Sequence, residues 1–276
     1  MRVDAHQHFW NLQLVDYPWL RPEHGPIYRT IEPAELEPQL RAAGIDKTVL
    51  VQSANSAEDT DYMLRQAEQY EWIGGVVGWV PLLEPKEAEQ RLKRFSKHSL
   101  FKGVRHLIHD EPDPDWVLQE PVIEGLRALS AYGMTFDVVA VFPNHLKHVP
   151  TLAERVPDLK LVIDHLAKPP IRQKGWEPWA EQLARAAEYP NVYAKISGLN
   201  TAAGEGWTAD DLKPYIDFAM SRFGANRLMF GSDWPVSLLS DDYMRVWTET
   251  NRALSGYSGA ELAAVFGKTA ATFYNL

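Results

Sequence analysis

The stretch Arg2-Val-Asp-Ala-His-Gln-His8 is the first of eight short runs that are apolar and rich in strand-forming residues. The other seven runs lie at residues 47–52, 73–80, 101–107, 134–141, 160–165, 192–197 and 227–233. Successive runs begin about 30 residues apart, which is the length of one strand and one crossover helix. Strands that alternate with helices at this spacing are typical of a parallel sheet, and eight such units predict a closed (β/α)₈ barrel.

The segments between these runs have the spacing of apolar residues that amphipathic helices show. Residues 33–43 place Leu36, Leu40 and Ala43 on one helical face, begin with proline and are followed by Gly44, as start and stop signals require. Similar stretches cover residues 62–70, 88–95, 120–132, 146–155, 176–187, 209–223 and 241–254, and a final helical stretch at 258–276 is expected to close the barrel. An open doubly wound sheet is the alternative, but no Gly-x-Gly-x-x-Gly motif follows the first run. We therefore expect one barrel domain over residues 1–276.

The composition excludes several classes of function. Among 276 residues, 28 are Lys or Arg and 37 are Asp or Glu, so the net charge of −9 argues against a nucleic-acid or anionic-membrane partner held by bulk charge. No cysteine is present, which excludes disulfides, thiolate zinc sites and a cysteine nucleophile. No apolar run approaches the ~18 residues of a membrane span, and no signal core follows Met1. We expect a soluble cytoplasmic protein with a small-molecule substrate, and nothing in the sequence supports an oligomer.

The interval between the first two runs is the longest, and its first part, residues 9–30, is rich in aromatic side chains that include Trp10, Tyr17 and Trp19. Loops of this length without structure of their own are usually functional. One interpretation is a flap over the barrel mouth. The other is a plug that packs against the next helices, and the two have equal support in the sequence.

Polar residues collect at the carboxyl ends of the runs, where barrel active sites are built. His6 and His8 are two residues apart in a strand, so both imidazoles face the barrel axis and can converge on one metal ion. The later runs end with Gln52, Arg105 and His106, Asp137, Asp164 and His165, Lys195 and Ser197, and Asp233 and Trp234.

Several of these residues have a purely structural alternative. His106 alone would be a satisfied structural histidine, and Asp164 would cap the loop after its strand. Arg105 would clamp strand ends, and Lys195 would pair with a carboxylate such as Asp137 or Asp233. The coincidence of two early histidines, a late histidine and a final aspartate at one end of one barrel favours a catalytic site over these alternatives.

Four motifs stand out along the chain: Asp4-Ala-His-Gln-His-Phe-Trp10, Lys102-Gly-Val-Arg-His106, Leu161-Val-Ile-Asp-His-Leu-Ala-Lys-Pro169 and Met229-Phe-Gly-Ser-Asp-Trp-Pro235. They resemble motifs of the amidohydrolase superfamily, and in particular of its branch of sugar-acid lactonases, which includes enzymes of the L-fuconolactonase and L-rhamnonolactonase type. The resemblance covers the whole chain, and the order and spacing of the motifs carry it.

The resemblance implies a metal site and two catalytic residues. His6, His8, His165 and Asp233 match the ligands of one divalent ion, expected to be Zn²⁺. Asp233 also matches the general base for the attacking water, and His165 is either a ligand or a group that polarises the carbonyl. Many members carry a bridging lysine on the fourth strand and a histidine on the fifth, where this chain has Arg105, His106 and Asp137, so we expect no binuclear centre. Activity without metal remains an alternative.

The residue types suit hydrolysis of a sugar-derived lactone by direct attack of water, because neither a cysteine nor a Gly-x-Ser-x-Gly nucleophile motif occurs. Asp233 can accept the proton of the water, and a metal, Arg105 or the histidines can stabilise the developing oxyanion. A sugar lactone carries many hydroxyl groups. The residues expected to bind it are Gln52, Arg105, His106, Asp137 and Trp234.

Three other functions remain open at this point. A lactonase for a dicarboxylate of aromatic degradation would need more cationic residues at the mouth than Arg105 and Lys195. A non-oxidative decarboxylase on the same scaffold would release carbon dioxide instead of acid. A binding protein or inactive barrel would have no physical need to bring four ionisable groups together.

Overall fold

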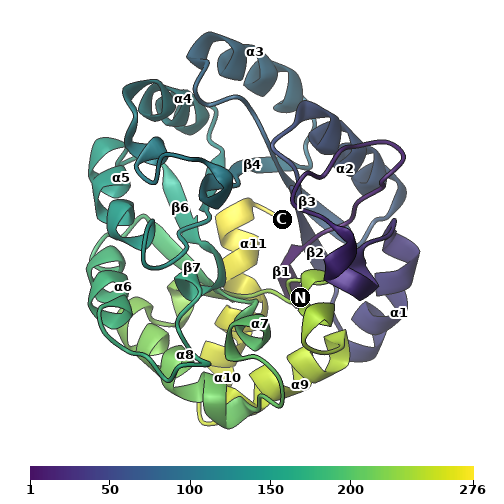
Figure 1. Ribbon diagram of the computed structural model, residues 1–276, viewed down its shortest axis with the longest axis vertical. Helices are drawn as coiled ribbons and strands as arrows, with labels where there is room; N and C mark the ends of the chain where they lie inside the picture. The colour runs from purple at the N-terminus through teal and green to yellow at the C-terminus, as the bar shows by residue number, and fades with distance from the viewer.

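A computed structural model describes all 276 residues and contains one sheet of eight parallel strands in the order of the chain (Figure 1). The strands are β1 (Val3–Gln7), β2 (Lys47–Val51), β3 (Ile73–Gly78), β4 (Phe101–His106), β5 (Thr135–Val138), β6 (Lys160–Ile163), β7 (Val192–Ile196) and β8 (Leu228–Phe230). Each strand lies within one of the eight predicted runs. The predicted (β/α)₈ barrel is therefore confirmed, and the open doubly wound sheet is not observed.

The barrel closes between β1 and the residues that follow β8. The backbone N–H of His8 donates to the carbonyl of Trp234 at 2.8 Å, and the N–H of Asp233 donates to the carbonyl of His6, also at 2.8 Å. These two bonds take the place of a longer β1–β8 ladder. They also hold His6, His8 and Asp233, three of the four predicted metal ligands, close to one another. The hydrogen bonds that close the barrel therefore also position these site residues.

All of the α-helices except the last surround the sheet on its outside (Figure 1). The helices are α1 (Pro33–Ala43), α2 (Ala57–Gln69), α3 (Pro85–Phe95), α4 (Glu120–Ala131), α5 (Val149–Arg155), α6 (Trp179–Ala187), α7 (Leu199–Ala203), α8 (Ala209–Phe223), α9 (Tyr243–Ala253), α10 (Gly259–Ala263) and α11 (Thr269–Tyr274). The bounds of α1 and α8 are those expected from the sequence. Helix α2 begins earlier than expected, because the Ser56 hydroxyl caps it by accepting from Asp59 N. None of the helices combines the length and apolar character needed to cross a bilayer.

The C-terminal helix α11 lies inside the ring of strands (Figure 1). Its residues Ala270, Phe273 and Tyr274 pack against the inward-facing side chains of the barrel, among them Val3 and Val77. Lys102, near the start of β4, donates to the carbonyl of Asn275, which places the chain end at the amino ends of the strands. The expected final helical stretch therefore closes the barrel at the end opposite its mouth.

The segment 9–30 is anchored at several points. Trp10 and Ile31 exchange two backbone hydrogen bonds, and the Tyr17 hydroxyl donates to Asp59 of α2 at 3.0 Å. The indole of Trp19 donates to the carbonyl of Ser53, just beyond β2, at 2.7 Å. The segment packs as a plug would, while Trp19 reaches the mouth as a flap would. Movement of the segment stays a prediction.

Candidate active site

A cavity of about 140 Å³ opens at the carboxyl ends of the strands. We call it the mouth cavity. It is lined by His8, Trp19, Ser53, Arg105, Leu107, His109, Val139, His165, Lys168, Asp233 and Val236. Three of the four predicted metal ligands thus border a space that a small molecule can enter, as the position of barrel active sites predicts.

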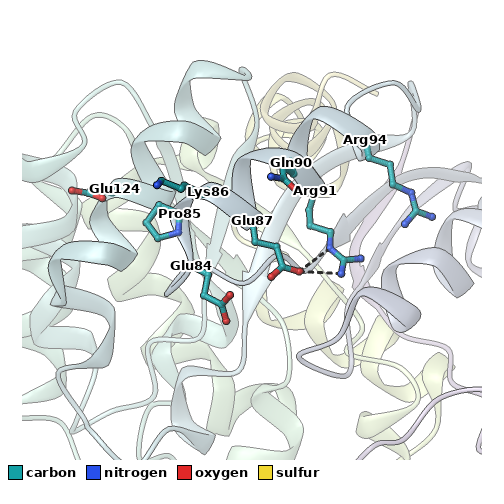
Figure 2. Close-up of a pocket in the computed structure, with 8 residues that line it drawn as sticks. All are labelled: Glu84, Pro85, Lys86, Glu87, Gln90, Arg91, Arg94 and Glu124. Carbon is teal, nitrogen blue, oxygen red and sulfur yellow. Dashed lines mark hydrogen bonds and ion pairs between the residues drawn. The ribbon is translucent and has the colours of Figure 1, made fainter.

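A larger hollow of about 830 Å³ lies on the outside of the barrel, along α3 (Figure 2). Its side chains belong mostly to one helix and are charged or polar, and Arg91 already pairs with Glu87 one turn away at 3.1 Å. It contains no histidine and no buried ionisable group. This hollow is the larger of the two, but the buried histidines and Asp233 border the mouth cavity.

The nitrogen atoms of three histidines surround one oxygen of Asp233. Asp233 Oδ1 lies 3.6 Å from His6 Nε2, 3.4 Å from His8 Nε2 and 3.8 Å from His165 Nε2. The Nε2 atoms of His6 and His8 are 3.1 Å apart. All four side chains are buried. The structure therefore brings together the four residues that the sequence assigned to the metal.

An irregularity in β1 allows both of its histidines to face inward. The pairing of β1 with β2 shifts between Asp4 and Gln7. Before the shift, Val3 and Ala5 point into the barrel. After it, Gln7 points outward and donates to Thr48 at 3.0 Å, so His6 and His8 on either side of it point inward.

The second nitrogen of each imidazole is occupied by the protein. His8 Nδ1 lies 2.8 Å from the carbonyl of Val51, which can only accept, so Nδ1 carries the proton and Nε2 keeps its lone pair. His165 Nδ1 lies 2.8 Å from the Ser197 hydroxyl. His6 Nδ1 lies 3.0 Å from Lys195 Nζ, which can only donate, and 3.3 Å from Asp164 Oδ1, which can accept. With Asp164 as the partner of His6, all three Nε2 lone pairs can point at a shared ion.

The protonation states also suit a metal site. Burial lowers the pKa of His165 to about 4, and burial lowers the pKa values of His6 and His8 as well, so the three rings are neutral at pH 7. Burial alone would raise the pKa of Asp233, but the three surrounding histidines outweigh it and hold that pKa below its usual value. Neutral imidazoles and an ionised carboxylate are the forms that bind divalent cations.

Three of these residues, His6, His165 and Asp233, could hold a metal ion, since their ligand atoms all lie within 4.8 Å of one another. With Zn–N and Zn–O bonds of about 2.0–2.1 Å, the four donor atoms of a tetrahedral site lie ~3.3 Å apart. The donor separations of 3.1 to 3.8 Å given above are close to this value. Second partners for the histidine rings, such as Asp164 and the Val51 carbonyl, are a regular feature of such sites.

Comparison with known proteins places this architecture in a family. A family profile described as amidohydrolase matches residues 3–276. The chain belongs to the amidohydrolase family. This membership agrees with the resemblance seen in its four sequence motifs.

Three relatives of this amidohydrolase are similar along its whole length. The L-fucono-1,5-lactonase of Burkholderia ambifaria is 38% identical over 280 residues, which cover 100% of this chain and 96% of that protein. The L-fucono-1,5-lactonase of Burkholderia multivorans is 35% identical over 288 residues, with the same coverage of each chain. A crystal structure of an amidohydrolase from Burkholderia multivorans with bound zinc has a TM-score of 0.92 and 34% identity, and covers 100% of this chain and 99% of that one.

A buried network of charges lies against the histidines of the amidohydrolase. Asp164 accepts from Arg105 Nη1 at 3.0 Å and lies 3.2 Å from Lys195 Nζ. Lys195 Nζ is 2.5 Å from Asp137 Oδ2 and 3.0 Å from His6 Nδ1. The two cations balance the two carboxylates, which removes the cost of burying each charge alone. The predicted pairing of Lys195 with Asp137 is therefore observed, whereas Asp164 is a partner of three other groups and not simply a loop cap.

The backbone at His165 and Asp233 is in an unusual conformation. Residues His165, Leu166, Ala167 and Lys168 all have positive φ angles, between 48° and 63°, and Asp233 has a φ of 57°. Such angles are unfavourable for residues with a side chain and are held by their surroundings. The Trp179 indole donates to the carbonyl of Leu166 at 2.8 Å and secures the run. This turn lets His165 and Lys168 both reach the mouth cavity.

Among the residues expected to bind substrate, Arg105 lines the mouth cavity. Gln52 is buried beside Arg105, and Arg105 Nη2 donates to the Gln52 carbonyl at 2.6 Å.

His106 stacks on Trp116 with ring centroids 3.9 Å apart and pairs with Glu111, on the opposite side of β4 from Arg105. Asp137 is enclosed by Lys195 and a tyrosine of α11. Trp234 is buried against Phe9. None of Gln52, His106, Asp137 and Trp234 lines the mouth cavity, so their contact with substrate stays a prediction.

The mouth cavity also contains residues that the sequence reasoning did not select. Trp19, Ser53, His109 and Lys168 all line it. Ser53, His109 and Lys168 follow β2, β4 and β6 by two to five residues, so they stand in the loops that form a barrel mouth. Attention to the first residues of each loop, rather than to strand ends alone, would have found these three.

The backbone of Gly198 lies directly against the side chains of His165 and Asp233, and only a residue without a side chain fits there. A Cβ at this position would lie 2.8 Å from His165 Nδ1 and 2.9 Å from Asp233 Oδ2, and its φ is +58°. We expect Gly198→Ala to displace both side chains and to weaken Zn²⁺ binding about tenfold, as measured by competition with a chelator. Gly133→Ala is the matched control, because Gly133 has a φ of +68° but no atom within 4 Å of the added Cβ. Equal zinc affinity of the two variants would contradict this account.

The low pKa of His165 makes stability depend on pH. The ordinary value of 6.5 applies to the unfolded chain, and burial lowers the pKa to about 4 in the folded state. As the pH falls from 6.5 toward 4, only the unfolded chain takes up this proton, so folding is weakened in that window. Between pH 7.5 and pH 5, His165 should therefore contribute a loss of about 2 kcal/mol in unfolding free energy of the chelator-treated protein.

The His165→Asn variant isolates this contribution from those of other groups. Burial raises the pKa values of Asp4 and Asp59 to about 6, and these act with the opposite sign in both proteins. Urea unfolding at the two pH values should show a smaller loss in the variant than in the wild type. An equal loss in both would show that His165 does not titrate as described.

Proposed function

We propose that this amidohydrolase opens a sugar-derived 1,5-lactone of the L-fuconolactone type to the free sugar acid. The observation that carries the proposal is the convergence of three imidazole Nε2 atoms and the Asp233 carboxylate at the mouth cavity. The identity of 38% to an L-fucono-1,5-lactonase over the full chain supports the substrate class.

The residues that would hold a zinc ion are His6, His8, His165 and Asp233. When bound there, the ion would lower the pKa of a water molecule and polarise the lactone carbonyl. Asp233 accepts the proton of the attacking water as the new C–O bond forms. It then returns this proton to the ring oxygen as the ester bond breaks, so that the product is a hydroxy acid.

Arg105 supports the developing negative charge. Its two Nη atoms are held by Asp164 and by the carbonyl of Gln52, which fixes the plane of the guanidinium. Its Nε is buried and has no partner in the protein, although Arg105 lines the mouth cavity. A substrate oxygen would supply that missing partner and gain a charge-assisted hydrogen bond.

The remaining lining suits a molecule with a small ring and several hydroxyl groups. The hydroxyl of Ser53 is buried without a partner, and Lys168 offers further donors. Trp19 presents an aromatic surface, which suits the apolar face of a sugar ring. Unpaired buried donors reject substrates that lack the matching oxygen, so these residues are the expected source of selectivity among sugar lactones.

The mouth cavity has few cationic side chains, which disfavours a dicarboxylate lactone as the substrate. Among the lining residues only Arg105 and Lys168 are cationic side chains, and Arg105 is already paired with Asp164. Lys195, counted from the sequence as a candidate, is enclosed beside Asp137 and does not line the cavity. A binding protein without activity would gain nothing from a buried base among three neutral imidazoles.

A panel of sugar lactones with a pH indicator tests the proposal. Acid release should be fastest with 1,5-lactones of the L-fucono configuration, slower with their epimers, and strongly reduced after exhaustive chelation and restored by Zn²⁺. Hydrolysis without any loss on chelation would leave the histidines as electrophilic donors only. Absence of acid release across the panel, or release of carbon dioxide from aromatic acids, would overturn the lactonase assignment.

A further inference from the structure

The C-terminal helix α11 places a tyrosine hydroxyl inside the barrel. Tyr274 is 1% exposed, and its hydroxyl lies 2.8 Å and 3.0 Å from the two oxygens of Asp137. Tyr274 enters from the amino ends of the strands, whereas Asp137 belongs to β5. The contact joins two residues 137 positions apart in the chain. It is one of two hydrogen-bonding groups that hold this fully buried carboxylate.

The other group on Asp137 is Lys195, and Lys195 leads to the metal site. Its ammonium lies 2.5 Å from Asp137 Oδ2, 3.2 Å from Asp164 Oδ1 and 3.0 Å from His6 Nδ1. Asp164 Oδ1 in turn lies 3.3 Å from the same His6 nitrogen. All of these side chains are buried. A continuous chain of polar contacts thus runs from the last helix to the first imidazole.

Whether Asp164 or Lys195 hydrogen-bonds to His6 Nδ1 decides whether His6 Nε2 can bind the ion. Where Asp164 accepts a proton from Nδ1, the Nε2 lone pair is available beside Asp233. Where Lys195 donates to Nδ1, the ring proton lies on Nε2 and that nitrogen can no longer be a ligand. The position of the Lys195 ammonium between Asp137 and His6 is therefore the critical geometry.

We propose that Tyr274 is a positioning residue of the active site, which fixes Asp137 and thereby sets where the Lys195 ammonium lies relative to His6 Nδ1. The C-terminal helix completes the site from the far end of the barrel. This inference rests on the proposed function only in taking His6 as a zinc ligand. A Tyr274→Phe variant keeps the ring packed against Phe273 but leaves the Asp137 carboxylate free to turn, so the ammonium of Lys195 is no longer fixed.

The test compares Tyr274→Phe with Tyr257→Phe. Tyr257, in the loop between α9 and α10, donates to Asp217 of α8 at 2.8 Å, so its variant also loses one tyrosine–carboxylate hydrogen bond. We expect Tyr274→Phe to bind Zn²⁺ about tenfold more weakly in competition with a chelator, since outer partners of metal ligands contribute at this scale. On the lactone substrate, kcat should fall about tenfold with KM within twofold, and the melting temperature should match that of Tyr257→Phe.

A double variant separates positioning from packing. If Tyr274 acts through Asp137, adding Tyr274→Phe to Asp137→Asn should change zinc affinity by less than twofold, whereas independent effects would multiply. Zinc affinity of Tyr274→Phe equal to that of wild type would overturn the inference alone. A wild-type chain that binds no Zn²⁺ would overturn it together with the metal-assisted mechanism. Zinc binding without turnover of any lactone would overturn only the proposed substrate, because the affinity ratio still decides the role of Tyr274.

Discussion

The Asp233→Asn variant is expected to lose about three orders of magnitude or more in kcat on the lactone substrate. Asparagine has nearly the same shape, but its amide can neither accept the proton of the attacking water nor supply a negative charge to the ion. Removal of a general base alone costs about 10²–10⁴ in rate. Asp233 Oδ1 is also the atom around which His6, His8 and His165 are arranged, so the variant should bind Zn²⁺ more weakly as well.

Asp110→Asn is the matched control for the loss of one negative charge near the mouth. Asp110 ends the short helical turn that follows β4, is about half exposed, and has a 3.6 Å contact with His109 Nε2 as its ion pair. Its replacement should leave kcat within a factor of about two, because exposed pairs contribute little. If Asp233→Asn retained turnover within tenfold of the wild type, the proton acceptor would have to be another group.

The sequence was sufficient to predict the barrel and the convergence of His6, His8, His165 and Asp233, for identifiable physical reasons. Side chains alternate along a strand, so His6 and His8 had to share a side, and the carboxyl ends of parallel strands meet at one rim. His165 and Asp233 follow from the same rule, although the left-handed backbone at both residues could not be foreseen from their identity. The rule works because it depends on backbone geometry alone.

The same rule explains why the substrate-binding predictions were less complete. Arg105 and His106 are consecutive in β4, so only one of them can face the barrel axis, and the sequence does not say which. The structure points Arg105 inward and stacks His106 on Trp116 outside. Whether Asp137 would border the mouth or pair inside the barrel depended on the last helix, whose entry into the barrel is set by tertiary packing rather than local pattern.

Lys195→Met is expected to cause the largest loss of stability of any single substitution considered for this chain. Lys195 is fully buried and lies between the carboxylates of Asp137 and Asp164, which are themselves buried. Removal of one partner from a buried ion pair leaves an uncompensated charge and costs about 3–5 kcal/mol. Urea unfolding at pH 7.5 should show this loss. Lys213→Met, which breaks the half-exposed pair with Asp217, should cost less than about 1 kcal/mol.

The pH dependence of the Lys195→Met variant provides an internal check on the cause. Burial raises the pKa of Asp137 from 3.8 to about 6 even with Lys195 present, and the loss of the cation raises it further. A carboxyl group with a raised folded-state pKa takes up its proton in the folded state first, so stability increases as the pH falls from about 6 toward 4. The variant should therefore recover part of its loss at pH 5.5, and Lys195→Met/Asp137→Asn should recover part of it at pH 7.5. A deficit that is the same at both pH values and unchanged in the double variant would mean that lost packing, and not the unpaired carboxylate, destabilises the protein.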